Sequence, residues 1–288
     1  GDEIEMIKED GDTQLLLKGG KLKFECLTIN PDDFNEVDIV ENGTSSFTTD
    51  SITLKDLIDH TSYACSTDTA RPIFTGTHID VSGTTLNMVA TDTHRLALKS
   101  AELAQPVEQP FKAVIPSRLL MEIARQLPTD IPQDVQIVAL RNFMTVRFGN
   151  IFIRTRLIEG EFPNYRRVIP TQFTSTVTLN RQEFTAAVER ASIVAKDAQY
   201  NVINFAIQDG QISLTSQHPD YGTIEDSVSC QIEGEPIRIA FNGKFVLDIL
   251  KHCHSEEIVL QLKTSSPMLV QDKDEQNCVF VVTPMRAK

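Results

Sequence analysis

The chain has 288 residues, of which 41% are hydrophobic, and its formal net charge at pH 7 is −13. This length suits two domains or three small ones, and no apolar run approaches the ~18 residues that cross a bilayer. The negative charge disfavours an ordinary nucleic-acid-binding module, which carries a basic surface. Five dispersed cysteines, without a CxxC pair, predict free thiols in a reducing cytoplasm, where we expect the protein to reside.

The first 40 residues predict a small strand-rich piece. Residues 14–17 and 22–27 are rich in apolar side chains and predict two strands, and the Asn-Pro-Asp-Asp sequence of residues 30–33 predicts a loop. The chain starts with acidic residues rather than with a basic and then apolar run, so a secretory leader is not expected.

Two amphipathic helices follow in the sequence pattern. Residues 54–61 place apolar side chains at helical spacing, and alternating apolar residues then predict strands as far as residue 98. Residues 117–127 predict the second helix, because apolar residues recur at helical spacing between Pro116 and Pro128.

The pattern then repeats. Residues 184–192 resemble residues 54–62 at an offset of 130, and residues 240–251 resemble residues 114–125 at an offset of 126. Repeats of this length are domains rather than solenoid units. Each predicts two helices and about eight strands, which makes an α+β domain with helices packed on antiparallel sheet.

The N-terminal piece fits the same scheme. Residues 22–27, followed by Phe34, echo residues 153–157, followed by Phe162. It therefore predicts the end of a repeat whose beginning is absent, and a fragment, a trimmed chain and a partial numbering all stay open as reasons. The expected organisation is a remnant of a first domain at 1–40, a second domain with its linker at 41–168, and a third domain at 169–288.

Residues 90–98 hold the densest group of polar side chains. The segment reads Ala-Thr-Asp-Thr-His-Arg-Leu-Ala-Leu, so a strand enters, five polar residues turn the chain, and a strand leaves. One interpretation is a polar hairpin in which Asp92 binds its own backbone. The alternative is an acid–base pair of Asp92 and His94 in a nucleotide-processing enzyme, although no nucleophile lies near them in sequence.

Other catalytic or metal-binding patterns are weak. The sequence has no phosphate-binding glycine motif, no HExxH and no GxSxG. His252-Cys253-His254 could hold a metal only with a second ligand cluster, and residues 272–275 lack the glycine and the glutamate of a calcium loop. We therefore expect no catalytic residues, no metal and no cofactor.

Two predicted helices carry cations at matching positions. Arg118 and Arg125 are seven residues apart, as are Lys244 and Lys251, so each pair lies on one helix face. A solvated face with pairing to an acid between the cations is the simpler interpretation of one such helix. Its repetition in two diverged domains favours a shared electropositive surface.

Three segments resemble the bacterial beta sliding clamp, the processivity subunit of the replicative DNA polymerase. Residues 90–97 are similar to the signature of its central domain, residues 159–168 to the link between its second and third domains, and residues 281–286 to its C-terminal tail. The resemblance runs through the whole chain in order. Thr93 stands where the family usually has Gly, which puts the conformation of the turn in question because Gly tolerates a positive φ.

This resemblance implies a non-catalytic sliding clamp that encircles duplex DNA without reading its sequence. It also implies tethering of polymerase subunits, a clamp loader and repair proteins through short peptide motifs, and a ring-shaped homodimer when the chain is full length. A ring needs only a mildly basic bore, so the acidic net charge is compatible with this function. A plain DNA-binding module at −13 should bind linear duplex poorly.

The resemblance also implies the site residues. The DNA-facing set is Arg71, Arg118, Arg125, Lys244 and Lys251, and the dimer interface comprises Phe24, Cys26, Ile193 and Val194. The peptide groove is implied at Phe74, Thr91, Thr93, His94, Arg95, Leu96, Pro163, Arg167, Val168, Tyr200, Asn242, Phe245, Val281, Val282, Thr283, Pro284, Met285 and Arg286.

Two expectations concern how this groove works. Arg95 and Arg286 would donate hydrogen bonds to a peptide, and the apolar tail would receive Leu or Phe side chains. Thr283 replaces a residue that is often Met, so one wall should be smaller and more polar. The alternative for the tail is a last edge strand that packs on its own sheet.

Overall fold

The computed structural model describes residues 3–9, 13–33, 43, 45–195 and 201–285. The chain divides into two compact units, residues 1–39 and residues 40–288, which are described separately. Within the described residues, no helix is long and apolar enough to span a membrane.

The first unit is a three-stranded antiparallel sheet in the order β1-β2-β3. It comprises β1 (Glu5–Ile7), β2 (Gln14–Gly19) and β3 (Leu22–Leu27). Both predicted strands are confirmed as β2 and β3, and the sequence missed only β1, which is too short to show alternation. The register places Met6, Leu17 and Phe24 on one face of the sheet, and Met6 and Phe24 are 70% and 55% exposed.

The second unit contains two repeats with the same order of elements. The first repeat comprises β4 (Ser45–Asp50), α1 (Ser51–Thr61), β5 (Gly76–Ser82), β6 (Thr85–Thr91), β7 (Arg95–Glu102), β8 (Phe111–Pro116), α2 (Ser117–Gln126), β9 (Asp134–Ala139), β10 (Phe143–Phe148) and β11 (Ile151–Arg156). The second comprises β12 (Ser175–Asn180), α3 (Arg181–Ala195), β13 (Val202–Gln208), β14 (Gln211–His218), β15 (Gly222–Gly234), β16 (Ile237–Asn242), α4 (Gly243–Leu250), β17 (Glu257–Leu262), β18 (Met268–Asp272) and β19 (Cys278–Val282). Two helices and eight strands recur in each, so the predicted α+β fold with helices on antiparallel sheet is confirmed.

Local chemistry sets the ends of the helices. Asp50 caps α1 because its side chain accepts hydrogen bonds from the backbone N–H groups of the first turn, and Asn242 caps α4 in the same way. Helix α2 ends at Gln126, and the next residue, Leu127, has the extended conformation that is favoured before Pro128.

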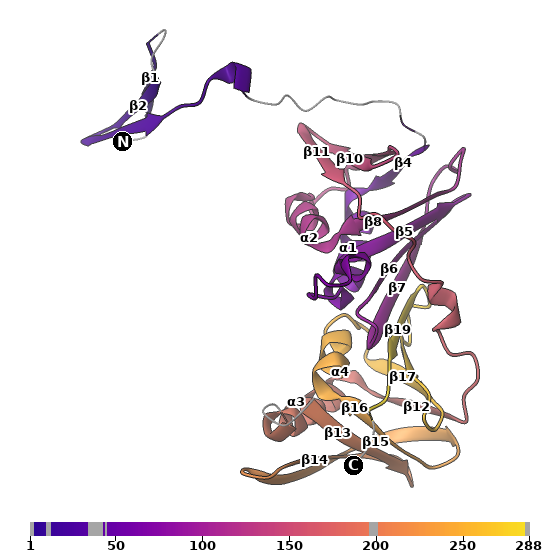
Figure 1. The fold of residues 1–288 in the computed structure, drawn as a ribbon. Helices are drawn as coiled ribbons and strands as arrows, with labels where there is room; N and C mark the ends of the chain where they lie inside the picture. Colours follow the sequence, from indigo (N-terminus) through magenta and orange to yellow (C-terminus); the bar gives the residue numbers. More distant parts are fainter. Residues whose placement is uncertain (1–2, 10–12, 34–42, 44, 196–200, 286–288) are drawn as a thin grey trace. The chain divides into compact units, whose positions relative to one another are not determined.

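The sheets explain how the two repeats are joined. One sheet has the order β11-β10-β9-β4, and the other has twelve strands in the order β16-β13-β14-β15-β12-β17-β18-β19-β7-β6-β5-β8. The terminal strand β19 lies between β18 and β7, so the alternative of a last edge strand was wrong. Helices α2, α4 and α3 lie along one side of the unit, and β7 and β19 along the other (Figure 1).

Candidate functional site

The turn between β6 and β7 is held by its own polar side chains. Asp92 Oδ1 accepts hydrogen bonds from the backbone N–H groups of His94 and Arg95, both at 2.9 Å. Thr91 Oγ1 donates to Arg95 O at 2.6 Å and accepts from Thr93 N at 3.1 Å. The interpretation as a polar hairpin with Asp92 bound to the backbone is therefore confirmed. Because the Asp92 carboxylate is engaged by this backbone, the geometry gives no support to an acid–base pair with His94.

Thr93 has φ = 78°, a conformation that β-branched residues rarely adopt. The turn thus keeps the positive φ that Gly would tolerate, with a Thr in its place. A conformation of this kind costs on the order of 1–3 kcal/mol and persists where the surroundings impose it.

Arg95 links this hairpin to the second repeat. Its side chain is 9% exposed, with Nε 3.1 Å from Asp92 Oδ2 and Nη1 2.6 Å from Asp248 Oδ2. Nη2 donates to Tyr63 O at 3.2 Å, and the guanidinium carbon lies 4.8 Å from the centre of the Phe245 ring. These three hydrogen bonds use three of the five N–H donors of the guanidinium, and donation from Arg95 to a bound peptide stays a prediction.

The C-terminal segment packs against the same hairpin. Thr283 donates from both its backbone N and its Oγ1 to His94 O, each at 2.9 Å, and Met285 N donates to Ala240 O at 2.7 Å. The His94 ring stacks on the Phe245 ring with centroids 6.1 Å apart. Hairpin, tail and the start of α4 therefore form one continuous surface.

The segment between the repeats joins this surface from the other side. Phe162 is buried and stacks on His78, with ring centroids 4.7 Å apart, and Phe74 meets Phe162 edge-on at 6.3 Å. Phe162 belongs to the same apolar cluster as Leu96 and Val281. A cavity of about 720 Å³ borders the segment between residues 157 and 167.

Helices α2 and α4 lie on the same side of the second unit (Figure 1), and the four predicted cations, Arg118, Arg125, Lys244 and Lys251, are exposed. Arg118 and Arg125 project from α2, and Arg125 pairs with Glu122 at 2.9 Å. Lys244 lies in the first turn of α4, and Lys251 immediately follows its last residue. Lys251 pairs with Asp248 at 3.3 Å, so each face keeps one cation without an ion pair to the acid on its own helix.

The comparisons with known proteins agree along almost the whole chain. Family models of the DNA polymerase III beta subunit match residues 48–164 for its central domain and residues 166–286 for its C-terminal domain. The beta sliding clamp of Bacillus subtilis (strain 168) is 31% identical over 275 residues, which cover 94% of this chain and 72% of that protein. The chain belongs to the beta sliding clamp family. The clamp chain is thus a DNA sliding clamp of DNA polymerase III and a non-catalytic processivity factor.

Solved sliding clamps have the same fold. A Pseudomonas aeruginosa clamp bound to griselimycin has a TM-score of 0.92 and 29% identity, covering 99% of this chain and 76% of that one. The Streptococcus pneumoniae beta chain has a TM-score of 0.91 and 30% identity, covering 99% of this chain and 75% of that one. The predicted family and function are confirmed.

The clamp structure groups most of the predicted peptide-groove residues into two neighbouring sets. Around the hairpin lie Thr91, Thr93, His94, Arg95, Asn242, Phe245, Thr283, Pro284 and Met285, and around the linker lie Phe74, Leu96, Pro163, Arg167, Val168 and Val281. Leu96, Val281 and Val282 are at most 2% exposed, so they support this surface from beneath. Tyr200 and Arg286 lie outside the described residues.

The remaining predicted residues divide between the units. Phe24 on β3 is 55% exposed and Cys26 is half-buried, while Ile193 on α3 is 72% exposed and Val194 is half-buried. Arg71 is exposed in the loop before Phe74, with its guanidinium carbon 5.6 Å from the centre of that ring.

The described residues contain no group of three or more metal-ligating side chains, and burial raises the pKa of Cys253 to about 12, which disfavours thiolate ligation.

A buried ionic cluster at the junction of the clamp domains was missed by the sequence analysis. Lys99, 2% exposed, lies 2.7 Å from Asp56 and 3.1 Å from Glu275 of the other domain. Burial opposes ionisation of Asp56, but hydrogen bonds from His60 and Lys99 hold its pKa at about 2. The only sequence signal is a lysine directly after the apolar run of residues 96–98.

Proposed function

We propose that the exposed cations on α2 and α4 form the DNA-facing surface of the clamp. Arg118, Arg125, Lys244 and Lys251 occupy matching positions in the two repeats, and Arg71 extends the set by resemblance. Cations on one side of a protein with net charge −13 would contact phosphates without reading bases.

Charge reversal tests this surface. Arg118→Glu/Arg125→Glu and Lys244→Glu/Lys251→Glu should weaken binding to duplex DNA in fluorescence anisotropy. The slope of log affinity against log salt concentration should fall by about 0.9 for each phosphate that is no longer neutralised. Lys263→Glu/Lys273→Glu, which makes the same charge change near β17 and β18, is the matched control. Equal DNA binding and salt slopes in all three variants would show that the assignment is wrong.

We propose further that the hairpin, tail and linker surface receives short linear peptides of polymerase, clamp-loader and repair proteins. The observation that carries this proposal is the junction of Thr283 with His94, beside the half-buried side chains of Phe245, Pro284 and Met285. Apolar and flexible side chains of this kind adapt to several Leu- or Phe-bearing partners.

Truncation of the tail tests the groove. Removal of residues 284–288 should leave the fold intact, because β19 ends at Val282. A labelled Gln-Leu-Asp-Leu-Phe peptide should bind the truncated chain more weakly by roughly 2 kcal/mol, as expected when side chains that anchor a ligand are removed. Removal of residues 287–288 alone is the control, and unchanged affinity after the longer truncation would contradict the proposal.

We propose the organisation 1–40, 41–168 and 169–288, with ring closure by the first-domain side of one copy and the third-domain side of another. Phe24 and Cys26 lie on β3, an edge strand of its sheet, and the first half of β15 has a neighbour on one side only among the described residues. Unpaired strand edges are the usual sites of sheet-to-sheet association.

Sedimentation at micromolar concentration tests this assembly. The 288-residue chain should be mainly monomeric and should bind clamp peptides, because no described side chain of the first unit is buried and its three-stranded sheet therefore lacks a packed core that would hold an interface rigid. A full-length chain should form a closed dimer that remains on circular DNA in the cytoplasm. A stable dimer of the 288-residue chain would contradict the expectation.

A further inference from the structure

The two clamp repeats differ at the seam between their two sheets, which is the place where β7 could pair with β4 in the first repeat and where β15 pairs with β12 in the second. In the second repeat, β15 continues for 13 residues, and its last five, residues 230–234, pair with β12. In the first repeat, the corresponding β7 ends at Glu102, and β4 pairs with β9 alone. Residues 103–107 turn away, and two of their backbone N–H groups donate to Gly83 O and Thr84 O. Strand β4 therefore keeps one unpaired edge within residues 45–195 and 201–285.

The register shows which backbone groups face that edge. Ser51 N donates to Gln133 O at 2.9 Å, so this pair is hydrogen-bonded between the chain segments of β4 and β9. Because hydrogen-bonded and non-hydrogen-bonded pairs alternate in an antiparallel ladder, Ser46 and Thr48 direct their N–H and C=O groups away from β9. The residues of β12 that lie 130 positions later use the same groups to pair with β15.

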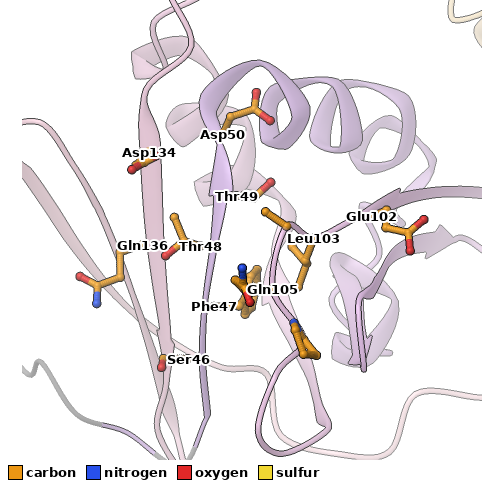
Figure 2. A pocket seen from close by; sticks show the side chains of 12 residues that line it. Ser46, Phe47, Thr48, Thr49, Asp50, Glu102, Leu103, Gln105, Asp134 and Gln136 are labelled. Atoms are coloured by element: carbon orange, nitrogen blue, oxygen red, sulfur yellow. The ribbon is translucent and has the colours of Figure 1, made fainter.

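A cavity of about 550 Å³ runs along the unpaired edge. Figure 2 shows β4 at its centre, Asp134 and Gln136 of the neighbouring strand on one side, and the loop with Leu103 and Gln105 on the other. Thr48 is exposed at this edge, whereas Leu103 is buried. The cavity has the size of typical binding sites and an open row of backbone donors and acceptors.

The acidic side chains that line this cavity favour a basic ligand. Asp50, Glu102 and Asp134 contribute carboxylates, and the twelve lining residues include no Lys or Arg. We propose that this seam binds an extended basic segment of a partner protein, which adds to β4 as a fifth strand of the β11-β10-β9-β4 sheet. The site lies apart from the hairpin and tail residues of the proposed peptide groove, none of which line it.

The strand that fills the second repeat provides the probe. A fluorescein-labelled peptide Ser-Lys-Gln-Ile-Lys-Gly copies residues 229–234 with Lys at the positions of Cys230 and Glu233. We expect saturable binding to the 288-residue chain, with amide chemical-shift changes at Ser46, Thr48 and residues 102–105. The same peptide N-methylated at Gln and at the second Lys, which removes the pairing N–H groups, should bind about tenfold more weakly. A version with Glu in place of both Lys residues should also bind more weakly.

Variants of the clamp separate backbone pairing from side-chain contact. Thr48→Pro removes an N–H that β9 does not use, so it should keep the thermal stability and reduce affinity about tenfold. Thr48→Val keeps that N–H and should bind as the parent does. Glu102→Gln/Asp134→Asn should reduce the preference for the basic over the acidic peptide. The proposal fails if no binding occurs at millimolar peptide, if N-methylation or Thr48→Pro has no effect, or if the shifts map to Phe245 and Met285.

Discussion

Strands β7 and β15 hold the same place in the two repeats but have different neighbours. Strand β7 pairs with β6 on one side and with β19 of the other repeat on its second side. Strand β15 pairs with β14 over its first half and with β12 of its own repeat over its last five residues. One repeat therefore uses its strand edge to bind the next repeat, whereas the other uses it to close its own sheets.

The side chains of the two strands follow this difference. Strand β7 carries two buried cations, Arg95 and Lys99, which pair with Asp248 and Glu275 across the junction. The first half of β15 carries mostly exposed polar residues. The edge that the two repeats share is thus reinforced by buried ion pairs, whereas the first half of β15 carries exposed polar side chains.

The largest effect should come from proline in the shared edge. Ser100 N donates to Asn277 O at 2.9 Å, so alternation places the N–H of Leu98 toward β19. Leu98→Pro should lower the free energy of unfolding by about 3 kcal/mol or more, measured by chemical denaturation. Glu225→Pro is the matched control, because Cys230 N bonds to Gly210 O and alternation leaves the Glu225 N–H on the free edge. Equal losses in both variants would contradict the comparison.

Removal of the Arg95 side chain should have the next largest effect. Arg95→Ala removes the guanidinium from two largely buried carboxylates, Asp92 and Asp248, and leaves Asp248 with only the exposed Lys251. Loss of such a buried pair costs about 3 kcal/mol. Arg190→Ala is the control, since the Arg190 side chain is 51% exposed beside Asp226 and its pair should contribute less than about 1 kcal/mol. A loss in Arg95→Ala no larger than in the control would show that the junction does not depend on this guanidinium.

Acid should weaken the same junction by a smaller amount. Burial and the neighbouring His60 lower the pKa of His252 to about 4, and its ring stacks on Tyr63 at 4.2 Å. Between its ordinary pKa and about 4, the unfolded chain binds the proton and the folded chain does not, so stability falls as the pH falls.

Replacement of His252 isolates this contribution. The parent should lose about 1–2 kcal/mol more than His252→Phe between about pH 7.5 and about pH 5. His60 acts in the opposite sense, because burial disfavours its charged form but the hydrogen bonds that its ring donates to Asp56 raise its pKa above the ordinary value. The stabilisation of the fold by the interaction of His60 with Asp56 is fully present below the ordinary pKa of histidine, and it is lost as the pH rises through the raised pKa of His60. A parent-like profile in His252→Phe would refute the assignment.

The smallest effect concerns the turns that lead into the two strands. Thr93 at φ = 78° precedes β7, and Gly222 at φ = 97° begins β15. Thr93→Gly should raise the unfolding free energy by about 1 kcal/mol, because the relief of strain exceeds the entropy cost of Gly. Gly222→Thr should lower it. A destabilised Thr93→Gly variant would mean that the Thr91 and Asp92 hydrogen bonds require the Thr side chain at this position.

The sequence alone determined the repeated fold and the nature of the hairpin. Apolar residues at helical spacing predicted α1 and α2, and the offset of 130 residues predicted α3, because side-chain periodicity directly reflects which face of an element is buried. The hydrogen bonds of the Asp92 side chain with the N–H groups of His94 and Arg95 also join residues that are close in sequence, and the hairpin formed as expected. Strand β1 was missed because three residues are too few to show alternation.

Only the tertiary structure decided which strand edges and charges were shared. Nothing in the sequence pairs β19 with β7, or brings Asp248 to Arg95 and Glu275 to Lys99, because partners more than 150 residues apart leave no periodic signal. The same limit hid the difference between β4, which keeps a free edge, and β12, which does not. Local sequence sets the periodicity of an element, whereas its neighbours are chosen by the packing of the whole chain.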